Sequence, residues 1–82
     1  MTPEARITAV VQRQLQQRGA TRTPGPDEDL RAAGLTSMDM LNLVLSIEAE
    51  FDLTIPENGI SPANFRSISS IGRLVAGLLP GS

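Results

Sequence analysis

The chain has 82 residues, enough for one domain spanning 1–82 around a small hydrophobic core, and its net charge of −2 disfavours nucleic acid as a partner. It contains no cysteine, histidine, tyrosine or tryptophan, which removes disulfides, thiolate chemistry, the commonest general base and the commonest metal ligand. We therefore expect no catalytic residue, no metal site and no enzyme activity in this chain.

A first helix is predicted to begin at Thr2, where a hydroxyl cap is followed by Pro3 and by an acid in the first turn. The helix is predicted to end at Arg18, with Gly19 in the position after the last turn where glycine is favoured. We expect this helix to be structural and its arginines to be solvated. Its apolar residues recur at helical spacing: Ile7, Val10, Val11 and Leu15.

A long connection, residues 19 to 36, follows this helix and contains Thr23-Pro24-Gly25-Pro26. A loop of this length in a small domain needs either a function or internal order. We expect Asp27 to cap a short helical turn that ends near Gly34. Leu30 and Leu35 would then hold the loop against the helices.

The next helix is predicted to begin at or just after Ser37 and to end near Phe51, because Thr36 and Asp39 match a capping box. Two apolar stripes follow it at three- and four-residue steps, and one small core rarely needs both. We expect the first stripe to be buried and the second to be presented to a partner. The first is Met40, Leu43, Val44, Ile47 and Phe51, and the second is Met38, Leu41 and Leu45.

The C-terminal third is predicted to hold a turn at 55–59, one short helical turn at 61–65, and a last helix capped by Ser67 and ended by Pro80. No strand pattern is present. The fold class is therefore all-α, a small four-helix bundle with three main helices, one short helix and a long first loop. The last helix has one apolar side: Ile68, Ile71, Leu74, Val75, Leu78 and Leu79.

The segment Gly34-Leu35-Thr36-Ser37-Met38-Asp39, the apolar helix after it, and the exit Glu48-Ala49-Glu50-Phe51-Asp52-Leu53-Thr54-Ile55-Pro56 resemble an acyl or peptidyl (aminoacyl) carrier protein. The resemblance covers roughly residues 30–79. It implies a 4′-phosphopantetheine arm, taken from coenzyme A, on Ser37. It also implies as partners a phosphopantetheinyl transferase, an acyl or aminoacyl ligase or transferase, and downstream synthase or tailoring enzymes. Thr36 stands where the family usually has aspartate, which bears on the choice of transferase.

Ser37 lies where unpaired backbone N–H groups and the helix dipole favour negative charge, so a phosphodiester on its oxygen would be stabilised there. The alternative reading is that Ser37 only begins the helix, since serine is preferred at helix starts for capping alone. The whole matching segment favours the modified serine.

The second apolar stripe is our candidate for partner docking, through an apolar strip with acidic neighbours that meets a groove rimmed by basic residues. Either stripe could instead be core, since methionine at helical spacing is usually packing. Asn42 stands where acyl carriers have an acid, so this mildly acidic helix favours a specialised or secondary-metabolic pathway over primary fatty acid synthesis. The predicted docking residues are Met38, Leu41 and Leu45, flanked by Asp39, Glu48 and Glu50.

One alternative function is an unmodified carrier-like helical module that only binds proteins, in which Thr36 marks the loss of modification. The N-terminal residues lack the pattern of a secretory signal, and no segment is long enough to span a bilayer. We expect a cytoplasmic monomer with no membrane association.

Overall fold

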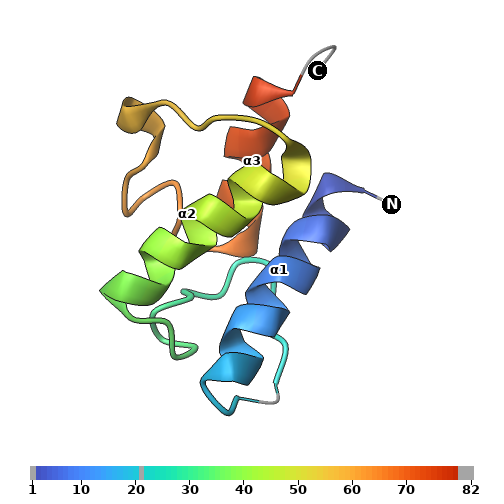
Figure 1. The fold of residues 1–82 in the computed structure, drawn as a ribbon. Coiled ribbons are helices and arrows are strands. Elements are labelled where there is room, and N and C mark those ends of the chain that lie inside the picture. The colour runs from blue at the N-terminus through green and yellow to red at the C-terminus, as the bar shows by residue number, and fades with distance from the viewer. Residues whose placement is uncertain (1, 21, 80–82) are drawn as a thin grey trace.

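A computed structural model of the chain describes residues 2–20 and 22–79. These residues form three α-helices and no strand, which confirms the all-α prediction (Figure 1). The elements are α1 (Pro3–Gln17), α2 (Ser37–Phe51), a single 3₁₀ turn η1 (Glu57–Gly59) and α3 (Ile68–Leu78). Pro80, predicted to end the last helix, lies outside the described residues.

The short turns predicted in the C-terminal third are present, and η1 lies within the turn predicted at 55–59. The segment 61–65 forms one helical turn, as predicted, in which the Phe65 N–H donates to the Ser61 carbonyl at 3.1 Å. The Ser61 hydroxyl caps this turn by accepting from the Asn64 N–H at 3.2 Å. Phe65 is buried, as expected, so the turn still closes the core.

α1 begins and ends at the predicted signals. The Thr2 hydroxyl accepts from the Ala5 N–H at 3.2 Å, and Gly19 takes a φ of +83°, a conformation that costs glycine little. The arginines of this region stay at least a third exposed, as expected, but two of them also form close ion pairs. Arg6 donates from Nε to the Glu50 carboxylate at 2.9 Å, and Arg18 forms the ion pair described below.

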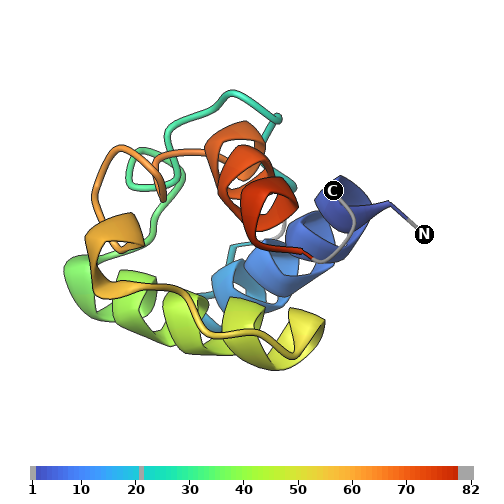
Figure 2. The same cartoon turned by 90° about the horizontal axis from the view of Figure 1, so that it is seen from above.

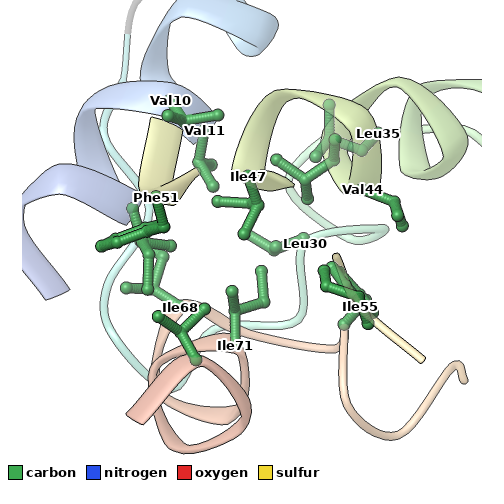
Figure 3. Close-up of a cluster of buried hydrophobic side chains, with 14 of the residues drawn as sticks. Val10, Val11, Leu30, Leu35, Val44, Ile47, Phe51, Ile55, Ile68 and Ile71 are labelled. Atoms are coloured by element: carbon green, nitrogen blue, oxygen red, sulfur yellow. The ribbon is translucent and has the colours of Figure 1, made fainter. Parts of the chain in front are cut away.

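The core lies between the three helices, where α1 packs against both α2 and α3 (Figures 1 and 2). Figure 3 shows Val11 of α1, Ile47 of α2 and Ile71 of α3 pointing toward one another, and all three are 0% exposed. Leu30 and Ile55 reach the same cluster from the two long connections. The loops therefore complete the core.

The long first loop is ordered by contacts with the start of α3. Leu30 and Leu35 are buried as predicted, and the Leu30 N–H donates to the Arg66 carbonyl at 2.8 Å. The predicted cap at Asp27 was wrong. Asp29 takes that role, because its Oδ1 accepts from the Arg31 N–H at 2.9 Å and fixes the turn that follows.

After α2 the chain turns at Asp52, which has a φ of +51°, and runs back along the helix toward its N-terminal half (Figure 2). It then enters α3 through the predicted cap. The Ser67 and Ser70 side chains and N–H groups form a reciprocal capping box there. Within the ranges 2–20 and 22–79, no helix combines the length and the apolar character needed to cross a bilayer.

Candidate functional site

Ser37 is the first residue of α2 and its side chain is exposed. The predicted capping box before it is present. The Thr36 Oγ1 accepts from the Asp39 N–H at 3.3 Å, and the Asp39 Oδ2 accepts from the Thr36 N–H at 2.8 Å. The box fixes where α2 begins, so the Ser37 hydroxyl lies at the open N-terminal end of the helix. First-turn N–H groups there have no partner within the helix.

Two side chains, one in α1 and one at its C-cap, hold this first turn in place. The Arg18 guanidinium binds both oxygens of the Asp39 carboxylate, Nε to Oδ2 at 2.8 Å and Nη2 to Oδ1 at 3.0 Å. The Gln14 Nε2 donates to the Asp39 carbonyl at 2.6 Å. With Thr36, these residues form what we call the entry cluster. It ties the start of α2 to the end of α1 and so positions Ser37.

The Asp39 carboxylate forms its ion pair inside the domain, with Arg18. Its side chain is nearly buried, and the Arg18 guanidinium, together with the Thr36 N–H, holds the pKa of its carboxyl below the usual range. The sequence places Asp39 on the acidic rim of the docking strip, but the residue is only 7% exposed, which leaves its carboxylate little surface for a partner. We therefore leave Asp39 out of the docking surface.

Thr36 contributes to the same cluster through its hydroxyl. It donates to the Asp39 Oδ2 at 3.0 Å and accepts from the Arg18 Nη2 at 3.2 Å. An aspartate at this position would place a second carboxylate beside Asp39, and two neighbouring carboxylates repel each other. Threonine caps the helix without that repulsion.

Sequence reasoning missed Gln14 and Arg18 as parts of the site. The four-residue spacing along the buried side of the first helix could have identified both residues. Gln14 follows Val10 by four residues, on the buried side of α1, where it is only 7% exposed. A polar side chain at a core position must find a hydrogen-bond partner, and Arg18 continues the same side one turn later.

The two stripes of α2 differ in exposure as the sequence predicts, except that Met40 of the first stripe is only half-buried. Leu43 and Ile47 of the first stripe are 0% exposed. Met38, Leu41 and Leu45 of the second are 68%, 57% and 63% exposed. We call these three residues the exposed strip. Their accessibility fits a docking role, and the docking itself stays a prediction.

The two glutamates predicted to flank this strip, Glu48 and Glu50, also make contacts within the domain. The Glu50 carboxylate pairs with Arg6 at 2.9 Å and lies 3.9 Å from the Arg13 guanidinium. The Glu48 Oε2 accepts from the Ile55 N–H at 2.8 Å in the turn that leaves α2. The hydrogen bond from Ile55 leaves the Glu48 carboxylate charged, and both acids are partly exposed, so their attraction of a basic partner surface stays a prediction.

An open groove of about 510 Å³ begins at Ser37 and is mostly apolar; we call it the Ser37 groove. One wall is the side of α2 that carries Ser37, Met40, Leu41 and Val44, and the other is the segment 60–65. Arg31, Arg66 and Asp29 also line it. An exposed hydroxyl at the start of such a groove gives a long, flexible arm both an attachment atom and room to lie.

The family of the phosphopantetheine attachment site matches residues 5–76 of this chain. The chain belongs to this family. As a member it is a carrier, on which phosphopantetheine is attached covalently, and it serves as the partner of enzymes rather than as a catalyst.

Named relatives are similar over most of the chain. Aminoacyl carrier protein 1 of Bradyrhizobium diazoefficiens is 46% identical over 70 residues, which is 85% of this chain and 78% of that protein. Aminoacyl carrier protein 2 of the same organism is 41% identical, over 85% of this chain and 79% of that protein. The aminoacyl carrier protein of Agrobacterium fabrum is 39% identical over 72% of this chain and 71% of its own length.

Solved structures agree with the fold. A chain in the crystal structure of the Bradyrhizobium japonicum glycine:[carrier protein] ligase, complexed with its cognate carrier protein and an analogue of glycyl adenylate, superposes with a TM-score of 0.83. That chain is 40% identical, over 92% of this chain and 96% of its own length. In the complex of an engineered form of that ligase with the Agrobacterium tumefaciens carrier protein and ATP, the matching chain has a TM-score of 0.71 and 32% identity, over 88% of this chain and 99% of that one.

Proposed function

We propose that this chain is an aminoacyl carrier and that its 4′-phosphopantetheine arm is attached to Ser37. The observation that carries the proposal is the position of Ser37, exposed at the start of α2 and within the matched family region. Three other serines are engaged in caps of the fold. Ser61 caps a turn, and Ser67 and Ser70 form a buried capping box.

The entry cluster and the helix start would each contribute to attachment. The Ser37 oxygen would form a phosphodiester with the arm, and the first-turn N–H groups of α2 and the helix dipole would stabilise its negative charge. Arg18 and Gln14 would keep the first turn of α2 fixed relative to α1 while a transferase acts on it. The arm would supply the thiol that carries the cargo as a thioester.

The cargo is proposed from the relatives. They are aminoacyl carriers, and the solved complexes pair a carrier with a glycine ligase, so we infer an amino acid as the carried group and an ATP-dependent amino acid ligase as the loading enzyme. A phosphopantetheinyl transferase would act before it, and an acceptor enzyme of a specialised pathway after it. These reactions use coenzyme A and ATP, so we propose a cytoplasmic location.

Intact mass tests the attachment site. The protein is incubated with coenzyme A and a broad-specificity phosphopantetheinyl transferase, beside Ser37→Ala and the matched control Ser46→Ala on the same helix. We expect the mass of one phosphopantetheinyl group to be added to the wild type and to Ser46→Ala, and nothing to Ser37→Ala. No gain in the wild type with several transferases would favour the unmodified protein-binding module instead.

A further inference from the structure

We propose that the Ser37 groove docks on an apolar patch bordered by aspartate and glutamate on the amino acid ligase that loads the arm. The proposal rests on the function proposed above and adds the charge of the partner surface. It reverses the expectation from the sequence, in which acids of the carrier face basic residues of the partner.

The apolar part of this surface lies on both walls of the groove. Leu41 of α2 and Ile60 of the facing segment line it and are 57% and 43% exposed. Met38, one turn from Leu41 on the same helix, is 68% exposed. A cluster of large apolar side chains on the surface of a protein usually marks an interaction site.

Two arginines border the same groove close to Ser37. Arg31 and Arg66 both line it and are exposed. The hydrogen bond from the Leu30 N–H to the Arg66 carbonyl, 2.8 Å, joins the two loops that carry these arginines. Within the described part of the chain, no carboxylate lies within 4.0 Å of either guanidinium. Both are therefore available to bind carboxylates of a partner in the bidentate geometry that arginine favours.

The acids near the groove offset this charge only in part. Asp29 lines the groove and keeps its negative charge, because the Arg31 N–H that its Oδ1 accepts is neutral, so the two arginines leave a net positive charge there. Asp39 is paired with Arg18 beneath the first turn of α2. Glu48 lies eleven residues after Ser37, about 16 Å farther along the helix axis. The end of the domain that presents Ser37 is thus apolar and cationic, although the chain as a whole is acidic. Complementary charge on the partner is negative.

The test reverses the two groove charges in the holo protein. Loading by the Bradyrhizobium japonicum glycine:[carrier protein] ligase is followed by intact mass with ATP and glycine, and kcat/KM is compared for wild type, the double variant Arg31→Glu with Arg66→Glu, and the control Arg73→Glu. Arg73 is an exposed arginine on α3 that does not line the groove. Thermal unfolding of each variant confirms that it is folded.

We expect the double reversal to lower kcat/KM about tenfold at low ionic strength and less at high salt, because the charges steer and align the encounter. Arg73→Glu should stay within about twofold of the wild type. Loading of the folded double variant at the wild-type rate would overturn the inference and leave the proposed function standing. A wild-type holo protein that accepts no amino acid would overturn the proposed function and the inference together.

Discussion

The two sides of α2 meet different surroundings. On the inner side Leu43 and Ile47 are fully buried, and the Asp39 carboxylate is bound by Arg18 and by the backbone of Thr36. On the outer side the exposed strip and the Ser37 groove lie open. The comparison teaches that acids on a short helix need not face a partner. Here Asp39 and Glu50 are ion-paired within the domain, while the exposed strip and the two arginines of the groove have no such partner among the described residues.

The largest effect on stability is expected from the inner side. Ile47→Ala should lower the free energy of unfolding by about 2–5 kcal/mol, because it removes a fully buried side chain and leaves a cavity. The matched variant Leu45→Ala on the outer side, where the side chain is 63% exposed, should change it by less than about 0.5 kcal/mol. Urea unfolding of both variants measures the difference. Equal losses would mean that the two sides of α2 are not distinct.

A smaller effect is expected where the entry cluster joins α1 to α2. Arg18→Met keeps the apolar part of the side chain and removes the partner of Asp39, so stability at neutral pH should fall. The folded pKa of Asp39 is lowered, so the contribution of the pair is complete above the unfolded pKa of about 3.9 and is lost as the pH falls through the folded pKa.

Unfolding midpoints between neutral and strongly acidic pH test this pairing, with Arg73→Met as the control for the loss of one surface arginine. The wild type and Arg18→Met should differ at pH 7 and converge in acid, while Arg73→Met should follow the wild type throughout. A gap between wild type and Arg18→Met that persists at the lowest pH would show that Arg18 acts by packing instead of by charge.

Helix boundaries could be predicted from the sequence because caps are local. The Thr36–Asp39 and Ser67–Ser70 boxes join residues three apart, so each can be recognised without the rest of the fold. The exposure of Met38 and Leu41 followed from helical spacing for the same reason.

The partners of the charged residues could not be predicted in that way. Glu50 meets Arg6 across 44 positions, and Asp39 meets Arg18 only because α1 and α2 pack side by side. The Ser37 groove likewise needs the segment 60–65 to return beside α2. Such features depend on tertiary packing, and a count of acids along the chain does not contain that information.

The central claim is that the side chains on the outer side of α2 bind partner enzymes and contribute little to the stability of the domain. The variant Leu41→Asp tests this claim most directly. Leu41 is 57% exposed and lines the groove that begins at Ser37. The measurement pairs the urea midpoint of the holo variant with its kcat/KM for glycine loading. We predict an unchanged midpoint and a loss of about ten- to thirtyfold in kcat/KM, the size expected for an apolar residue at the centre of an interface. Unfolding of the variant, or loading at the wild-type rate, would contradict the claim.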